Sequence, residues 1–159
     1  MICDLPSFRL TIAQELGFAV CDFSKEDFNM TARRYFGEAH SLNGLVPNID
    51  CYIDASGAES ILELFMQTRK IESRLVNVAV NKSLRNLDML HLTYSSQSII
   101  GSGGYMPEDI KDVQQIMAGG RWNIERIITQ EFPLQQIQEA LEAASDINKS
   151  LNVVVKFQH

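Results

Sequence analysis

The sequence has no long hydrophobic run and no excess of basic residues. No apolar stretch reaches the roughly 18 residues that a membrane-spanning helix needs. The formal net charge is −6, and an acidic chain without a basic patch is poorly suited to bind nucleic-acid phosphates. The amino terminus lacks a basic segment followed by an apolar one, so no signal peptide is expected. We therefore expect a cytoplasmic protein that binds neither a membrane nor a nucleic acid.

Cysteine and histidine are scarce, with three of each. The sequence has no Cys-x-x-Cys pair and no cysteine–histidine spacing that is typical of a zinc site. Cys3, Cys21 and Cys51 all fall in apolar, strand-like segments, which predicts buried thiols. The histidines are isolated from one another, so we expect no metal or catalytic role for them. These are His40, His91 and His159.

Strand-like and helical segments alternate from the amino terminus to Gly101. Strands are expected at residues 1–3, 19–21, 49–54, 75–80 and 98–100. Helices are expected at residues 8–16 with Ser7 as cap, from Ser24 to about Gly37, at 58–68 and at 86–94. Residues 40–48, which include Gly44 and Pro47, are expected to form a loop. Because the strands are too apolar to be half exposed, the pattern favours a parallel sheet with helices on both faces.

The pattern changes after Gly104. A helix is expected at Pro107–Ala118, where proline opens it and two glycines follow it. Another helix is expected at residues 134–144, and a final strand at residues 153–157. The strand–helix alternation therefore belongs to residues 1–104, and residues 105–159 form a separate segment.

Asp4 follows the first apolar strand. An acidic side chain beyond the carboxyl end of a parallel strand can accept hydrogen bonds from the hydroxyls of an adenosine ribose, and it repels a 2′-phosphate, which favours NAD over NADP. Arg9 lies one turn into the following helix and can approach the same ribose or a nearby phosphate. An aspartate after a strand is more often a turn or cap residue, so both interpretations stay open.

Several segments, in the correct order, resemble zinc-dependent medium-chain alcohol and polyol dehydrogenases such as sorbitol and butanediol dehydrogenases. They are similar to the regions after the second, fourth and sixth Rossmann strands, to the Thr-His-x-Phe-Pro-Leu segment and to the strand near the carboxyl terminus. The segments are residues 4–17, 54–57, 99–105, 128–134 and 149–157. The resemblance extends over nearly the whole chain.

This resemblance implies an α/β fold built on a truncated Rossmann-type, doubly wound parallel sheet whose first strand is missing. Residues 1–104 would form a partial NAD-binding domain. Residues 105–159 would supply the carboxyl-terminal helices and strand that return to the catalytic domain in the family. The implied activity is that of an oxidoreductase acting on CH–OH groups with NAD.

The resemblance also implies two groups of cofactor-binding residues. Asp4 and Arg9 would hold the adenosine ribose of NAD. The nicotinamide would lie beside residues 78–80, which are also expected to belong to a buried strand, and would be bordered by a turn after the sixth strand. These residues are Val78, Ala79, Val80, Ser102, Gly103 and Gly104.

Two parts of the family pattern are not found in the sequence. The Gly-x-Gly-x-x-Gly turn, which brings backbone N–H groups to the pyrophosphate, would precede Met1. The domain that supplies the catalytic zinc ligands would also precede it. We therefore expect no catalytic residue, no zinc ligand and only weak NAD binding, with no turnover by this chain alone. The alternatives are a standalone non-catalytic nucleotide-binding or dimerisation module, and a subunit that assembles with a separate catalytic-domain chain.

Without the first strand, the strands at residues 2–3 and 49–54 lose the neighbour that they would share. They could pair directly, accept a strand from another chain, or leave the amino-terminal segment detached. We expect a remodelled sheet and a homodimer. The family dimerises by continuing the sheet through its sixth strand, which here runs from Ser98 to Ile100.

Overall fold

The computed structural model describes residues 1–157 of the 159-residue chain. The chain folds into two compact units. The first unit combines Met1–Glu26 with the chain from Met106 onward, and the second unit is Asp27–Tyr105. The expected domain boundary after residue 104 remains a prediction. The expectation for His159 concerns a residue outside the described part.

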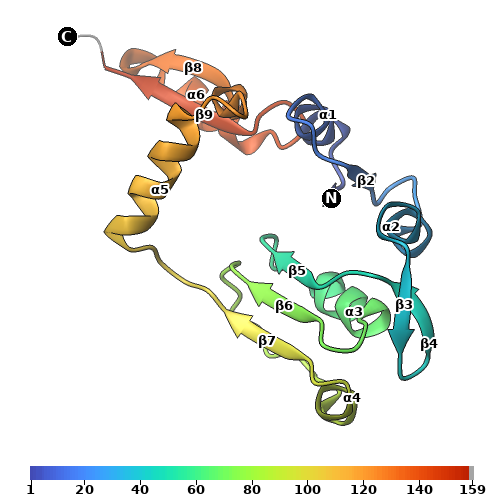
Figure 1. The fold of residues 1–159 in the computed structure, drawn as a ribbon. Coiled ribbons are helices and arrows are strands. Elements are labelled where there is room, and N and C mark those ends of the chain that lie inside the picture. The colour runs from blue at the N-terminus through green and yellow to red at the C-terminus, as the bar shows by residue number, and fades with distance from the viewer. Residues whose placement is uncertain (158–159) are drawn as a thin grey trace. The chain divides into compact units, whose positions relative to one another are not determined.

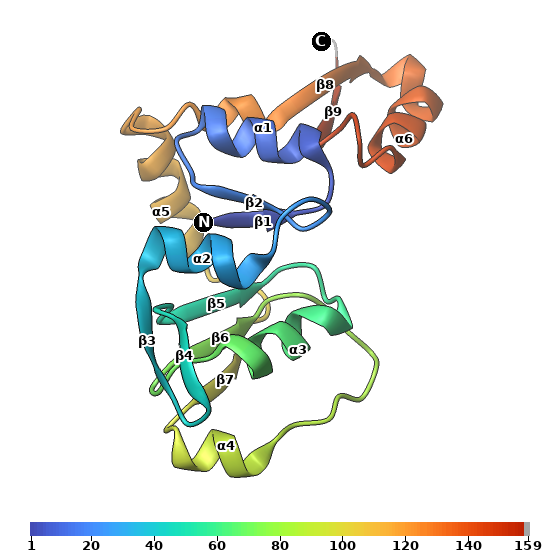
Figure 2. The same cartoon turned by 90° about the vertical axis from the view of Figure 1, so that its right-hand side faces the viewer.

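The first unit begins with a strand–helix–strand segment. β1 (Ile2–Asp4) and β2 (Val20–Asp22) are parallel, and α1 (Ser7–Glu15) connects them. Figure 2 shows α1 running alongside the two strands. Its buried side chains are Leu10, Ile12 and Ala13. All three elements lie within one or two residues of the positions that the sequence predicts.

The remainder of the first unit contains a second parallel pair of strands. β8 (Ile128–Pro133) pairs with β9 (Asn152–Lys156), and α6 (Ile137–Ser145) packs against both. Figure 1 shows this group at the orange and red end of the chain. The helix α5 (Pro107–Ala118) has the predicted bounds. The sequence did not predict β8 as a strand, and the first turns of the helix predicted at residues 134–144 are a 3-10 helix at Leu134–Gln136.

The second unit contains a three-stranded parallel sheet in the order β5-β6-β7, with helices in the connections (Figure 1). Its elements are α2 (Phe28–Phe36), β3 (Glu38–Ser41), β4 (Gly44–Pro47), β5 (Cys51–Asp54), α3 (Glu59–Thr68), β6 (Arg74–Asn77), α4 (Met89–Tyr94) and β7 (Ser98–Gly101). With the parallel pairs of the first unit, this sheet confirms the predicted α/β fold with parallel sheets.

The expected loop at residues 40–48 is wrong, because β3 and β4 form an antiparallel hairpin. Gly44 has φ of +123°, which glycine adopts without steric cost, and it closes the turn opposite Ser41. Pro47 ends β4, where an edge strand tolerates a residue without an N–H group. The two residues that suggested a loop therefore serve as the turn and the end of a hairpin.

The buried strand expected through residues 78–80 is also wrong. β6 ends at Asn77, and the N–H groups of Val78 and Ala79 both donate to the carbonyl of Asp54, at 3.0 and 3.1 Å. This pair of bonds turns the chain away from the sheet. Val78 is consequently 40% exposed and Val80 is 94% exposed.

The expected burial of the cysteines is confirmed for Cys21, whereas Cys3 is partly exposed and Cys51 is exposed. The exposure of Cys51 follows from the alternation of burial along β5. Tyr52 and Asp54 point into the unit, whereas Cys51 and Ile53 are exposed. Successive side chains of a strand point to opposite faces, and α3 covers only the face that carries Tyr52. Cys51 is therefore an accessible thiol.

Two helix starts differ from the expected caps. Ser7 is the first residue of α1, and Pro6 occupies the cap position without a side-chain bond. The helix α2 begins after Asp27, whose carboxylate accepts the N–H of Met30 at 2.8 Å, and not at Ser24.

The two strands expected to flank the missing first strand belong to different units. Within the first unit β1 is hydrogen-bonded to β2, and within the second β5 is hydrogen-bonded to β6. Direct pairing, a strand from a second chain and a detached amino-terminal segment all remain predictions.

An aromatic cluster forms the core of the second unit. Phe65 of α3 is fully buried, and its ring meets Tyr52 edge-on at 5.3 Å between centroids. Phe28 of α2 lies 6.5 Å from Tyr52 on another side. The hydroxyl of Tyr52 lies 3.0 Å from the carbonyl of Thr68 and 3.1 Å from its Oγ1. Burial raises the pKa of Tyr52 to about 12, so this hydroxyl remains a donor at neutral pH.

Tyr52→Phe should lower the free energy of unfolding by about 1 kcal/mol, because it removes hydrogen bonds from a buried hydroxyl and leaves the ring in place. Urea unfolding of the full chain measures the change. Tyr94→Phe is the matched control, because Tyr94 is 73% exposed and its replacement should leave the midpoint unchanged. Equal effects of the two variants would contradict this role for the Tyr52 hydroxyl.

Candidate cofactor-binding site

The residues predicted to bind a cofactor divide between the two units. Asp4 and Arg9 lie in the first unit, at the end of β1 and within α1. The others follow β6 and β7 in the second unit. They are Val78, Ala79, Val80, Ser102, Gly103 and Gly104. Each group has its own geometry within its unit.

Asp4 and Arg9 are close together, as predicted. Asp4 is the last residue of β1, and its Oδ1 accepts the N–H of Leu5 at 2.8 Å. Its Oδ2 lies 3.9 Å from Nη1 of Arg9, and the two side chains are 35% and 30% exposed. The Nε of Arg9 is buried and has no acceptor among the described residues. The Asp4 carboxylate therefore keeps lone pairs, and the Arg9 guanidinium keeps N–H groups, that no other group of the described chain uses.

The neighbouring strand ends in a second aspartate that sequence analysis did not single out. Asp22 is paired with Asp4 in the strand register. Its carboxylate accepts the N–H and hydroxyl of Ser24 at 2.9 and 2.5 Å, and Nζ of Lys25 at 2.7 Å. The hydrogen bonds from Lys25 and Ser24 lower the pKa of Asp22 to about 2. The signal was available, because Asp22 follows an apolar strand just as Asp4 does.

These bonds link the turn after β2 to the first residue of α1. Nζ of Lys25 also donates to the hydroxyl of Ser7 at 2.9 Å, and that hydroxyl lies 3.4 Å from Oδ2 of Asp22. The Asp22 carboxylate is thus occupied by groups of its own chain, in contrast to that of Asp4. Of the two aspartates, Asp4 is the one that has room for an external partner.

In the second unit, Asn77 brings the two predicted stretches together. Its Nδ2 donates to the carbonyl of Ala79 at 3.1 Å, and its own carbonyl accepts the N–H of Ser102 at 2.9 Å. The segments that follow β6 and β7 are therefore hydrogen-bonded to Asn77 at the carboxyl ends of the strands. The carboxyl ends of the strands are where α/β sheets bind ligands.

The turn after β5 packs against this edge. Oδ1 of Asp54 accepts the N–H and the hydroxyl of Ser56 at 2.9 and 3.0 Å, and the N–H of Gly57 at 2.9 Å. Gly57 has φ of +71°, and a Cβ added there would lie 3.3 Å from Cβ of Ala79. The carbonyl of Gly57 accepts Nδ2 of Asn81 at 2.7 Å. The methyl group of Ala79 therefore packs on this turn.

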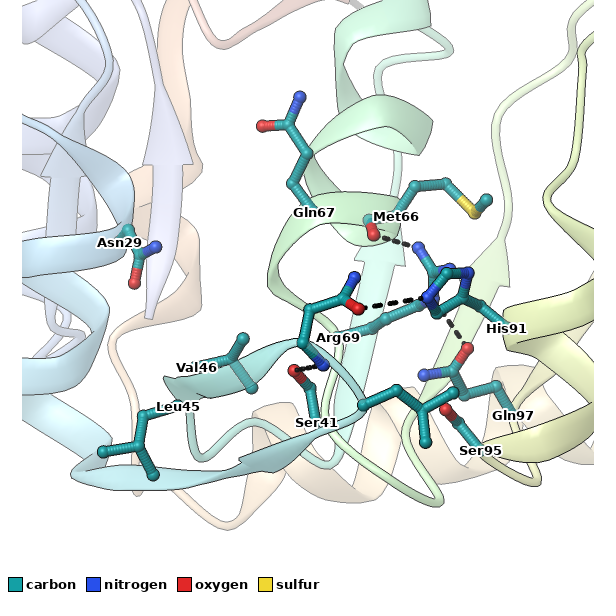
Figure 3. Close-up of a pocket in the computed structure, with 12 residues that line it drawn as sticks. Asn29, Ser41, Leu45, Val46, Met66, Gln67, Arg69, His91, Ser95 and Gln97 are labelled. Atoms are coloured by element: carbon teal, nitrogen blue, oxygen red, sulfur yellow. Dashed lines mark hydrogen bonds between the residues drawn. The ribbon is translucent and has the colours of Figure 1, made fainter.

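A cavity of about 160 Å³ lies near the amino-terminal ends of the strands of the same sheet (Figure 3). It is lined by the tip of the β3–β4 hairpin, the end of α3 and the turn before β7. At its centre Arg69 is bound by Gln97, whose Oε1 lies 2.7 Å from Nε, and by the carbonyl of Met66. The predicted cofactor residues follow β6 and β7, whereas this cavity involves residues that precede these strands.

The buried guanidinium of Arg69 joins three elements of the second unit. Burial lowers the pKa of Arg69, and Asp88, with Oδ2 at 3.7 Å, opposes that change. The same Asp88 oxygen is bound to Nδ1 of His91. No local pattern in the sequence indicates this network, because its members lie far apart in the chain. The polar groups around the cavity hold α3, α4 and β7 to one another.

Neither a metal cluster nor a membrane-spanning helix is found in the described part of the chain. Residues 1–157 contain no group of three or more His, Cys, Asp or Glu side chains placed to hold a metal ion. No described helix is long and apolar enough to cross a bilayer. The donor set of a catalytic zinc site therefore does not fit these residues.

Comparison with known sequences identifies relatives among sorbitol dehydrogenases. No family model matches the chain. Sorbitol dehydrogenase of Mus musculus is 27% identical over 156 residues, which are 98% of this chain and 42% of the mouse protein. The Homo sapiens enzyme is 27% identical over 146 residues, which are 89% of this chain and 38% of that protein. The chain thus spans about two fifths of the length of these relatives.

Solved structures share the fold over nearly the whole chain. 2R,3R-butanediol dehydrogenase from Bacillus subtilis has a TM-score of 0.78 at 20% identity, covering 97% of this chain and 42% of its own. The alcohol dehydrogenase TADH from Thermus sp. ATN1 has a TM-score of 0.80 at 20% identity, covering 98% and 43%. An alcohol dehydrogenase from E. coli CFT073, complexed with NADH, has a TM-score of 0.78 at 20% identity, covering 98% and 43%.

The predicted resemblance to polyol and alcohol dehydrogenases is confirmed over part of their length. The chain is similar in sequence to the sorbitol dehydrogenases, and it has the fold of the corresponding fragments of butanediol and other alcohol dehydrogenases.

Asp22→Asn should lower the unfolding midpoint at pH 7, because it removes the charge that binds Lys25. The carboxylate has a lower pKa in the folded chain, about 2 against 3.8, so its stabilisation is present above about pH 4 and is lost as the pH falls towards 2. Urea unfolding at pH 7, 4 and 2.5 should show the difference from wild type shrinking in that order. Asp112→Asn, at an exposed position of α5, is the control and should show no such trend. A difference that persists unchanged at pH 2.5 would contradict the assignment.

Proposed function

We propose that the chain is the NAD-binding portion of a zinc-type alcohol or polyol dehydrogenase and that it does not turn over substrate by itself. The observation that carries the proposal is the partly exposed Asp4 carboxylate at the carboxyl end of β1, beside the guanidinium of Arg9. Homology to sorbitol dehydrogenases over 98% of the chain supports it.

The Asp4–Arg9 pair has the chemistry to bind a ribose. A carboxylate carries about four lone-pair sites, and the chain uses one of them for the N–H of Leu5. The vicinal hydroxyls of an adenosine ribose can donate to the others. The guanidinium of Arg9, whose side chain is 30% exposed, supplies donors for a ribose or phosphate oxygen. The Asp4 carboxylate would repel the negatively charged 2′-phosphate of NADP, so the pair favours NAD over NADP.

In this proposal the residues of the chain bind and orient NAD, and none of them is assigned to catalysis. Bound NAD would supply hydride-transfer chemistry. The ends of β6 and β7, with Val78, Ala79 and Ser102, would border the nicotinamide. No step is assigned to zinc, because the described residues lack its donor set. The sequence also contains no Gly-x-Gly-x-x-Gly turn, so the pyrophosphate loses its usual backbone donors and NAD should bind weakly.

NAD should bind the full chain with a Kd on the order of 1 mM, which corresponds to about −4 kcal/mol. Saturation-transfer-difference NMR detects binding in this range and identifies the protons in contact. We expect the adenosine ribose to show the strongest transfer. Asp4→Asn should weaken binding about tenfold or more, because a hydrogen bond to a charged group contributes about 1.5–3 kcal/mol.

Asp112→Asn is the matched control for this titration, since it removes one carboxylate from an exposed helix position. NADP should bind more weakly than NAD to the wild type, and Asp4→Asn should narrow that difference. Equal binding of NAD by wild type and Asp4→Asn, or no NAD contact at several times the expected Kd, would overturn the proposed site.

We also propose a homodimer through β7. This strand is at the edge of the β5-β6-β7 sheet. The N–H groups of Ser98 and Ser102 donate towards β6, at 3.3 and 2.9 Å. Because hydrogen-bonding direction alternates along a strand, the N–H of Ile99 faces the open edge. Ile100 is 44% exposed. A second copy could continue the sheet across a twofold axis.

Ile99→Pro should convert a dimer into a monomer, because it removes the outward N–H and obstructs strand pairing at the edge. Light scattering coupled to size exclusion measures the mass. Ile99→Thr keeps both the N–H and the branched side chain, so it should remain dimeric. A monomeric wild type, or a dimer that survives Ile99→Pro in a folded chain, would contradict this interface.

A further inference from the structure

Cys3 and Cys21 lie directly opposite each other on neighbouring parallel strands. The register pairs Ile2 with Val20, Cys3 with Cys21 and Asp4 with Asp22. Paired residues of parallel strands project to the same face of the sheet. Strands are about 4.8 Å apart, and disulfides join residues whose Cα atoms are about 4.4–6.8 Å apart. The two thiols are therefore placed for a bond between them.

The surroundings distinguish these two thiols from the third. Cys21 is fully buried and Cys3 is partly exposed, whereas Cys51 is exposed in the other unit. Burial, the charge of Cys21 and a hydrogen bond with Cys21 raise the pKa of Cys3 to about 12. At neutral pH the Cys3 thiol is thus protonated, and it is hydrogen-bonded to Cys21. Cys3 is the one that a small oxidant reaches first.

We propose that Cys3 and Cys21 are a modification site, at which a peroxide converts the two thiols into a reversible intrachain disulfide. The sulfur of Cys3 attacks one peroxide oxygen; the S–O bond forms, the O–O bond breaks, and the leaving hydroxide takes the thiol proton as water. The sulfur of Cys21 then attacks that of Cys3, forming the S–S bond and releasing the hydroxyl with its own proton as a second water. Two thiols lose two electrons and two protons, and one peroxide becomes two waters.

The geometry makes the disulfide reducible. Cβ atoms of paired residues on parallel strands follow the strand spacing of about 4.8 Å, whereas a relaxed disulfide needs about 3.8 Å. β1 and β2 must therefore approach each other locally. Both are in a two-stranded sheet, which can yield more easily than a central strand pair. A strained disulfide has a more oxidising potential and is released by ordinary thiols.

The test uses the full chain with Cys51→Ser, so that Cys3 and Cys21 are the two remaining thiols. The folded protein is treated with hydrogen peroxide, then unfolded in an alkylating reagent and mapped by mass spectrometry. We expect loss of alkylation at both positions together, a cross-linked peptide lighter by two hydrogens, and recovery of both sites after dithiothreitol. Oxidation should be slower than that of Cys51 in the wild type, because the thiolate is the reactive form.

Two double variants, Cys3→Ser with Cys51→Ser and Cys21→Ser with Cys51→Ser, are the controls and should form no intrachain bond. Treating the three-cysteine chain in urea shows the pairing expected by chance, which should include Cys51. The proposal is overturned if Cys3 in the folded chain proceeds to sulfinic acid while Cys21 stays alkylatable. It is also overturned if the Cys3–Cys21 bond is no more abundant in the folded chain than in urea. Neither outcome depends on NAD binding.

Discussion

Three of the parallel strands, β1, β2 and β5, end in an aspartate whose carboxylate accepts backbone N–H groups of the turn that follows. Asp54 accepts three donors from the two residues Ser56 and Gly57. Asp22 accepts Ser24 and Lys25. Short acidic side chains suit such turns because they reach the backbone two or three residues ahead. The direction in which the chain leaves each sheet depends on these bonds, and so does the position of the following helix.

Asp4 meets the same requirement with a single backbone bond, to Leu5. The difference matters because a carboxylate whose lone pairs are all used by its own turn has little to offer a ligand. The side chain of Asp22 is 11% exposed, whereas that of Asp4 is 35% exposed. At equivalent strand ends, Asp22 and Asp54 thus stabilise their own turns, whereas Asp4 remains available as an acceptor. That contrast favours Asp4 over the other two aspartates as the ribose acceptor.

Local patterns in the sequence were sufficient where one element determined the outcome. A starting proline and two following glycines placed α5, a serine near its start placed α1 to within one residue, and an amphipathic pattern placed α3. Prediction failed where a distant group intervened. β6 stops at Asn77 because the carbonyl of Asp54, far away in sequence, accepts two of the following N–H groups. The network of Arg69 and Gln97 similarly joins residues 28 positions apart, which periodicity cannot reveal.

The proximity of Asp4 and Arg9 was predictable because both lie within one strand–helix connection, whose geometry β1 and α1 determine locally. The strands of each unit pair with strands of the same unit: β1 pairs with β2, and β6 lies between β5 and β7. The proposed ribose contacts therefore use residues of the first unit, whereas the proposed dimer edge at β7 and the proposed nicotinamide contacts at Val78, Ala79 and Ser102 belong to the second. Substitutions at Asp4 and at Ile99 consequently test ribose binding and self-association independently.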